Sequence, residues 1–165
     1  MYMMRFDMRV PGKTPTQIAG HYRAAIDMAR WADEHGPCSI AVSEHHASAD
    51  GYLPAPLVLA AAMAAVTSQV GIMVAATLLP LYDPIRLAEE MIVLDHISRG
   101  RVGYVLGMGY RPAEYELYGL DFARRGQIAD DKLARLLQTL RRASAGEGMP
   151  RVTPAPFSPG QPMIM

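Results

Sequence analysis

The sequence predicts an α/β fold in which parallel strands alternate with helices, in a single domain that covers residues 1–165. Short apolar runs typical of buried strands alternate with longer segments of helical periodicity. The apolar runs begin near residues 4, 38, 70 and 101, and a spacing of roughly 30 residues is what a strand–helix–strand crossover needs. Most of these runs lack strict alternation, as expected of parallel strands that are covered on both faces.

The first strand and helix stand at the beginning of the chain. Residues 3–10 alternate in the manner of a strand, and Pro11 marks its end. A helix is expected over residues 16–36, because apolar residues recur there mostly at helical spacing and a glycine closes the pattern. Residues 38–43 then form a short apolar strand.

The same pattern occurs twice more. Prolines introduce an alanine-rich helix over residues 54–69 and a second helix over residues 84–100. Apolar strands are expected at residues 70–79 and 102–107. The repetition favours parallel strands over an antiparallel meander.

The last third of the chain is less regular. A short helix is expected at residues 113–118 and an amphipathic helix at 127–143, followed by a Pro/Gly-rich loop over 144–162. Residues 162–165 resemble the start of a fifth strand. A closed barrel of eight strand–helix units usually needs about 250 residues, so about four units form half of a TIM barrel. A smaller open sheet with helices on both faces is the alternative.

The chain ends inside the expected fifth strand, so a truncated barrel is expected. A half-barrel leaves open parallel strand edges, and such edges pair with other chains unless they are covered. The chain is therefore expected to self-associate, and a homo-oligomer is the predicted assembly.

Composition limits the class of ligand. The 16 basic and 16 acidic side chains cancel, so nothing builds the positive field that nucleic acid or an anionic membrane requires. No apolar run reaches the roughly 20 residues of a membrane span. A single cysteine, Cys38, and no apolar leader indicate a cytoplasmic protein. A small neutral or apolar ligand is expected.

The first candidate site is Glu44-His45-His46, where the second strand gives way to a loop. The carboxyl ends of parallel strands are where such folds place their active sites. Histidine exchanges protons near neutral pH, and a neighbouring carboxylate can hold its ring in one tautomer. A metal site is the weaker alternative, because adjacent residues of an extended strand point to opposite faces. A loop of solvated polar residues is the third interpretation.

The second candidate is the end of the third strand, at Ala75-Ala76-Thr77. Small side chains there would let a flat ring approach the backbone. The alternative is that the alanines relieve crowding against a helix.

The third candidate is Gly107-Met108-Gly109, followed by Tyr110. The glycines could allow a cofactor to approach the backbone. They do not form the dinucleotide fingerprint, because Pro112 takes the place of its third glycine. Turn or bulge glycines are the alternative.

Other polar residues have structural interpretations. Asp95 and the segment Ser98–Arg101 form a helix end and turn at the opposite face of the barrel, so capping and loop anchoring are expected. Cys38 begins a buried strand without a basic neighbour, which indicates an inert core thiol.

Taken in this order, the segments resemble the bacterial luciferase-like flavin monooxygenase family over essentially the whole chain. The motifs that carry the resemblance are Met4-Arg5-Phe6, Ser43-Glu44-His45-His46, Ala75-Ala76-Thr77 with Pro80, Leu94-Asp95-x-x-Ser98-x-Gly100-Arg101, Gly107-x-Gly109, Glu114, Tyr118-Gly119 and Gln161-Pro162-Met163-Ile164.

The resemblance implies an eight-unit barrel that binds reduced flavin mononucleotide (FMN), or in some branches a deazaflavin. Members oxidise small organic substrates with molecular oxygen and receive reduced flavin from a separate flavin reductase. The resemblance makes His45 the active-site acid/base. The residues it places at the cofactor are Glu44, Ala75, Ala76, Thr77, Gly107, Met108 and Tyr110. It also makes the Ala75–Ala76 peptide a candidate cis bond.

Two departures from the family pattern narrow the expectation. Luciferase has a reactive cysteine at the position of Gly107, so the light-emitting reaction is not expected. The family's flavin-phosphate site depends largely on strands and loops beyond residue 165. The ordered motifs still predict a flavin-dependent monooxygenase. The alternatives are a deazaflavin-dependent dehydrogenase that transfers hydride without oxygen, and a non-catalytic half-barrel fragment that self-associates.

Overall fold

Five parallel strands form one sheet in the computed structural model, which describes residues 2–36, 39–147 and 152–165. The strands are β1 (Met3–Arg5), β2 (Ser39–Val42), β3 (Gly71–Leu78), β4 (Val102–Gly107) and β5 (Met163–Ile164). Each strand pairs in parallel with the next one along the chain. A doubly wound sheet reverses its strand order at a switch point, whereas barrel strands follow one another around the wall. The parallel α/β fold is confirmed, and its strand order is that of a barrel wall.

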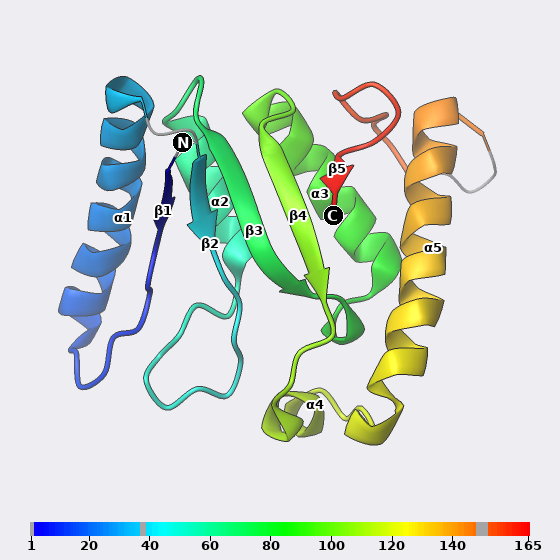
Figure 1. Cartoon of the computed structure of the whole chain (residues 1–165), viewed down its shortest axis with the longest axis horizontal. Helices are drawn as coiled ribbons and strands as arrows, with labels where there is room; N and C mark the ends of the chain where they lie inside the picture. Colours follow the sequence, from blue (N-terminus) through cyan, green and yellow to red (C-terminus); the bar gives the residue numbers. More distant parts are fainter. Residues whose placement is uncertain (1, 37–38, 148–151) are drawn as a thin grey trace.

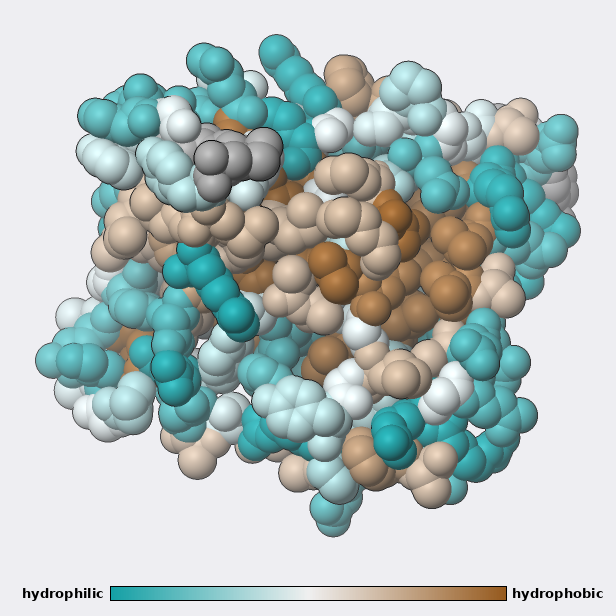
Figure 2. Space-filling model, viewed as in Figure 1, coloured by the Kyte–Doolittle hydropathy of each residue, from teal (hydrophilic) through white to brown (hydrophobic). Residues whose placement is uncertain are grey.

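Helices cover one face of this sheet. They are α1 (Pro15–His35), α2 (Pro56–Ala65), α3 (Pro84–Ser98), α4 (Pro112–Leu117) and α5 (Arg125–Ala145), with short 3-10 turns η1 (Leu79–Leu81) and η2 (Phe122–Arg124). Figure 1 shows α2 and α3 behind the sheet, α1 and α5 at its two sides, and α4 beyond the end of β4. The core includes Ile40, Ile72 and Tyr104 from the strands and Met91 and Leu136 from the helices. Figure 2 shows hydrophobic side chains gathered on the face of the molecule that Figure 1 turns to the viewer.

The predicted end of the first strand shifts because the strand loses its paired neighbour. β4 covers the predicted residues 102–107, but β1 ends at Arg5 instead of residue 10. Beyond Arg5 the side chains of Phe6 and Met8 remain buried while Asp7 is exposed. Alternation therefore reports burial on one side, whereas a strand also needs a paired neighbour. The prediction of an inert thiol at Cys38 falls outside the described residues.

Capping explains where α1 begins and ends. The Thr14 side chain accepts a hydrogen bond from the Gln17 amide, and the Gln17 side chain accepts one from the Thr14 amide. This reciprocal pair satisfies two amides that a helix start otherwise leaves open. The helix ends at Gly36, whose φ of 77° is the left-handed conformation that glycine adopts without strain.

Arg101 holds the loop between α2 and β3 through its guanidinium group. The sequence predicts this anchoring role for the segment Ser98–Arg101. Its Nη1 donates to Thr67 Oγ1 and to the Val70 carbonyl, both at 2.9 Å. Its Nη2 donates to the carbonyls of Ala64 and Thr67, both at 3.0 Å. Two of the acceptors, the carbonyls of Ala64 and Thr67, lie at or just beyond the end of α2, where a helix leaves carbonyls without helical partners. The predicted loop-anchoring role of this segment is confirmed.

Asp95 anchors the loop that precedes β5. Its buried carboxylate accepts hydrogen bonds from the amide and the hydroxyl of Ser158, both at 2.7 Å. The neighbouring His96 Nε2 lies 2.8 Å from the Ala155 carbonyl. These contacts tie the Pro/Gly-rich segment to the end of α3 and so bring β5 beside β4.

Asp33, near the end of α1, accepts hydrogen bonds from three consecutive amides, at Ser68, Gln69 and Val70. Burial alone would raise its pKa, but the hydrogen bonds from Val70, Gln69 and Ser68 outweigh burial and hold the pKa at about 2. A carboxyl whose pKa is lower in the folded chain stabilises that chain above its unfolded pKa. This stability is lost as the pH falls through the folded pKa.

We therefore expect Asp33→Asn to lower the free energy of unfolding by about 1–2 kcal/mol near pH 7, a value reduced for partial solvent screening. The difference from the wild type should shrink as the pH falls from about 5 towards 2. Urea unfolding across this pH range measures it. Asp27→Asn is the control, because Asp27 forms only an exposed ion pair with Arg30. A loss that stays constant with pH would contradict the prediction.

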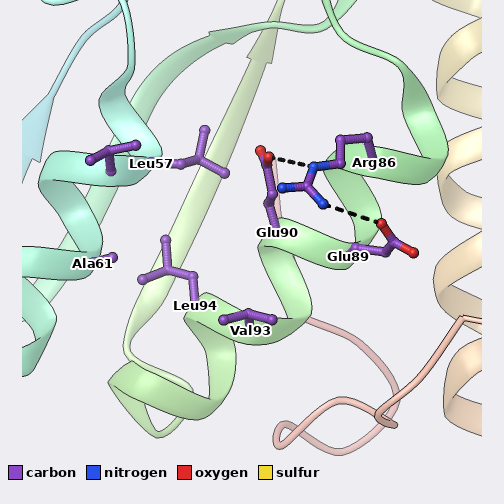
Figure 3. Close-up of a pocket in the computed structure, with 8 residues that line it drawn as sticks. Leu57, Ala61, Arg86, Glu89, Glu90, Val93 and Leu94 are labelled. Carbon is purple, nitrogen blue, oxygen red and sulfur yellow. Dashed lines mark hydrogen bonds and ion pairs between the residues drawn. The ribbon is translucent and has the colours of Figure 1, made fainter.

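A groove of about 280 Å³ lies between α2 and α3. Figure 3 shows Leu57, Val93 and Leu94 along it, with Arg86 bonded to Glu89 and Glu90 at one side. The rest of its rim is apolar, with Val58 72% and Val93 51% exposed. Across the described parts of the chain, no helix has the length and apolar character needed to span a membrane.

Candidate active site

The three predicted segments meet at one edge of the sheet. The loop after β2 carries Glu44, His45 and His46, β3 ends in Ala75–Leu78, and β4 ends at Gly107. Because parallel strands share their carboxyl edge, the strand register places these ends side by side, with Leu78 opposite Gly107.

The end of β3 has an irregular backbone. Ala75 pairs with Val105 and Thr77 with Leu106, so Ala76 is an extra residue that has no partner on β4. The Ala75–Ala76 peptide bond is cis, which confirms the prediction for this peptide.

His45 is held by a carboxylate from another part of the chain. Its Nδ1 lies 2.9 Å from Oε1 of Glu114, which is fully buried on α4. The same oxygen accepts the backbone amide of His46 at 3.0 Å. An ionised carboxylate only accepts hydrogen bonds, so Nδ1 of His45 donates and Nε2 remains for proton exchange.

Two aromatic rings flank His45. Its ring meets Tyr52 edge to face at 4.8 Å between centroids, and Tyr110 in the same manner at 5.7 Å. The side chain is 22% exposed, so it reaches solvent at the surface of the site. His45 thus combines a fixed orientation with access to a ligand.

His46 has a different environment. Its Nε2 lies 2.6 Å from Oε1 of Glu44, and its Nδ1 lies 3.1 Å from the hydroxyl of Tyr118. Glu44 Oε2 accepts the amide of Leu78 at 3.0 Å. His46 is only 7% exposed and Glu44 2%. Glu44 and His46 thus connect the loop after β2 to the end of β3, through Leu78, and to the end of α4, through Tyr118. These contacts give His46 a structural role.

Glu44 also affects a neighbouring phenol. Burial, followed by the negative charge of Glu44, raises the pKa of Tyr82 far above its ordinary value. Both carboxylate oxygens of Glu44 are thus used inside the protein. The Glu44 residue is 2% exposed, and its predicted contact with a cofactor stays a prediction.

Small residues at the ends of β3 and β4 form a floor at the same edge of the sheet. Ala75, Ala76 and Gly107 are partly buried and carry no side chain beyond Cβ. A Cβ built on Gly107 would lie 2.9 Å from the Cβ of Ala76, so only glycine lets β4 pass this close to the extra residue.

The remaining predicted residues lie apart from this floor. Thr77 is fully buried, and its hydroxyl has no hydrogen-bond partner among the described residues. Met108 is 48% and Tyr110 72% exposed, with Tyr110 beside His45. The strand register places Ala75, Ala76 and Gly107 at one edge of the sheet, and the loop that carries His45 leaves β2 at the same edge, whereas the side chain of Thr77 is buried.

No metal centre is formed by these side chains. Over residues 2–36, 39–147 and 152–165, no group of three or more His, Cys, Asp or Glu side chains is placed to hold a metal ion. The two histidines bond to different carboxylates, at Glu44 and Glu114.

The contact of Glu114 with His45 is not visible in the sequence, although Glu114 is one of the residues that carry the family resemblance. The residue lies 69 positions from His45 and on a helix of only six residues. Arg111 completes the contact, with Nη1 at 3.6 Å from Glu114 Oε1 and 3.3 Å from the His46 carbonyl. The only local signal is an acidic residue in the first turn of a helix that follows a strand.

The family model described as luciferase-like monooxygenase matches residues 3–165. The chain is 30% identical over 115 residues to the 4-hydroxyprotoasukamycin monooxygenase of Streptomyces nodosus, covering 68% of this chain and 31% of that protein. Among solved structures, monooxygenase RslO1 from Streptomyces bottropensis has a TM-score of 0.83 and 25% identity, covering 99% of this chain and 52% of that one.

A second solved structure is the oxygenating constituent of 3,6-diketocamphane monooxygenase from Pseudomonas putida, in complex with FMN. Its TM-score is 0.82 at 23% identity, and the match covers 98% of this chain and 49% of that chain. The chain thus spans about half the length of these solved structures and about a third of the curated relative.

Proposed function

The chain belongs to the luciferase-like monooxygenase family, and on that premise we propose that it supplies the proton-handling side of a flavin-dependent active site. The reaction is the oxidation of a small organic substrate with molecular oxygen. The observation that carries the proposal is the His45–Glu114 pair, placed at the strand edge that also bears the floor of Ala75, Ala76 and Gly107.

FMN is the proposed cofactor. Ala75, Ala76 and Gly107 would hold its ring, and the exposed Met108 would lie beside it. The FMN complex of the similar 3,6-diketocamphane monooxygenase supports this assignment. Reduced flavin, when bound, supplies the two electrons that the activation of oxygen requires.

His45 is the proposed acid/base. Glu114 accepts the Nδ1–H of His45, which leaves Nε2 to take a proton from the substrate or to return one. Edge-to-face contacts with Tyr52 and Tyr110 help to hold the ring in place. Proton transfer by a positioned side chain typically accelerates a reaction by about 10²–10⁴-fold.

A deazaflavin-dependent dehydrogenase is the second candidate. A solved F420-dependent secondary alcohol dehydrogenase has the same fold, with a TM-score of 0.61 at 20% identity. The floor and His45 suit either cofactor, because both present a planar tricyclic ring.

Binding of the reduced cofactor tests the proposal. The test uses the chain extended to the full length of its relatives. We expect its anaerobic titration with reduced FMN to saturate, and Ala75→Leu to weaken binding by at least about tenfold because the new side chain stands on the floor. Val58→Leu on α2 is the matched control. Equal affinity of the Ala75→Leu variant would place the flavin elsewhere, and tighter binding of reduced F420 than of FMN would favour the dehydrogenase.

The partners proposed with this function are molecular oxygen, a reductase that donates reduced flavin, and a second copy of the chain. The exposed apolar side chains Val58, Val93 and Ile97 on α2 and α3 support self-association. A cytoplasmic location is proposed with them, because the single cysteine of the sequence suits a reducing compartment.

A further inference from the structure

We infer that the groove between α1 and the loop 45–54 is the substrate site, and that it selects neutral, mainly apolar molecules. The inference rests on the proposed function, because the reacting group must lie near His45. It adds the position of the substrate and its chemical class.

The groove has the size and lining of a small-molecule site. Its volume is about 550 Å³, within the range of typical ligand pockets. Apolar and aromatic side chains line it: Ile18 from α1, Val10 from the segment before α1, and Tyr52 and Pro54 from the loop. His45 also lines it, so a molecule in the groove can reach the proposed acid/base.

The apolar lining continues away from His45. A second hollow of about 300 Å³ shares Tyr22 and Pro54 with the groove and is lined further by Ile26, Leu53 and Leu59. This hollow lies between residues of α1 and of α2. An elongated apolar molecule could therefore place its polar end at His45 and its tail along Tyr22.

Charge is absent from the lining. None of the residues around the groove is Asp, Glu, Lys or Arg. The nearest loop carboxylate, Asp50, accepts hydrogen bonds from Ser48 and the Tyr52 amide. The Ser48 hydrogen bond, and then Tyr52 and the charge of Arg9, lower the pKa of Asp50 below its ordinary value. Arg9 is paired with Asp7.

These contacts decide the class of substrate. The groove is shallow, so a charged molecule keeps part of its water there, but the part that covers the apolar walls meets no counter-ion, and this contact is unfavourable for a charge. A neutral molecule of the same shape gains from the apolar walls. The groove therefore discriminates by desolvation, with His45 as the polar contact at one end.

The test compares three ligands that share one tail: 1-decanol, decanoate and decylammonium. We titrate each, near neutral pH and without flavin, into chain that carries ¹³C-labelled methyl groups. The methyl signals of Val10 and Ile18 report the groove, and those of Val58 and Val93 report the α2–α3 groove. We expect decanol to shift the first pair and to bind at least about tenfold more tightly than either ion.

Charge-introducing variants sharpen the test. Ile18→Lys should raise the affinity for decanoate at least about tenfold and weaken decanol binding, because the new ammonium provides the missing counter-ion. Ala49→Lys places the same charge on an exposed position of the loop and repeats the test if Ile18→Lys does not fold. Val93→Lys, on α3, is the control and should leave both affinities in this groove unchanged.

Three results would overturn the inference. They are shifts confined to Val58 and Val93, equal or tighter binding of an ion by the wild type, and unchanged decanoate affinity in both lysine variants. Because flavin is absent from the assay, failure to bind reduced FMN would count against the proposed function and leave this result as it stands.

Discussion

Replacing His45 with asparagine should lower kcat by at least about 100-fold while the fold and flavin affinity are retained. The loss follows from the role of Nε2, since a positioned acid/base contributes about 10²–10⁴-fold. Asparagine keeps a polar side chain of similar reach but cannot exchange protons near neutral pH. The structure tolerates the change because His45 is 22% exposed and bonds through a single side-chain contact.

Single-turnover oxidation of a neutral substrate, started by mixing reduced FMN complex with oxygen, measures this loss. His46→Asn is the matched control, because His46 is adjacent but buried against Glu44 and Tyr118. It should lower the free energy of unfolding by about 2–4 kcal/mol, because it leaves the carboxylate of Glu44 buried without its partner. An active His45→Asn enzyme, or an inactive and fully stable His46→Asn enzyme, would reverse the two assigned roles.

Replacing Glu114 with alanine should reduce both kcat and stability. Its Oε1 accepts hydrogen bonds from His45 Nδ1 and the His46 amide, and alanine leaves both donors without this acceptor. We expect kcat to fall by about 10–100-fold, and the free energy of unfolding by about 2–4 kcal/mol. Glu114→Gln keeps an acceptor oxygen, so it should retain most of both quantities.

The tautomer of His45 distinguishes a positioning role from a purely structural one. In the wild type and in Glu114→Gln, the nitrogen NMR spectrum of a neutral His45 should show the proton on Nδ1. In Glu114→Ala the proton should move mainly to Nε2, the tautomer that free imidazole side chains prefer. An unchanged tautomer in Glu114→Ala, together with an unchanged kcat, would remove Glu114 from the mechanism.

The family assignment followed from several short motifs. No single motif identifies the family, but their order along the chain does. Each segment alone admits a structural interpretation, as Gly107-Met108-Gly109 does, yet the sequence of segments matches one family from residue 3 to 165. The strand order β1-β2-β3-β4-β5 also settles a choice that periodicity left open, because an open doubly wound sheet has a different order.

Local signals predicted local features well. β4 begins and ends at the predicted residues, and the helix closed by Gly36 ends in the conformation that glycine permits. The predicted end of the first strand at residue 10 was wrong. Phe6 and Met8 are buried in alternation with exposed residues, but neither is in register with a residue of β2. Alternation depends on which side of the chain is buried, and it says nothing about how far the neighbouring strand extends.

The sequence by itself determined the parallel fold, the family and the strand edge that carries the site. These properties depend on short-range periodicity and on residues near one another in the chain. Only the tertiary structure separated His45 from its neighbour His46, because the difference lies in the partners Glu114 and Glu44. One carboxylate comes from α4, 69 positions away, and the other from the same loop. No pattern of spacing specifies which oxygen a side chain will meet, since packing of the whole sheet against its helices decides it.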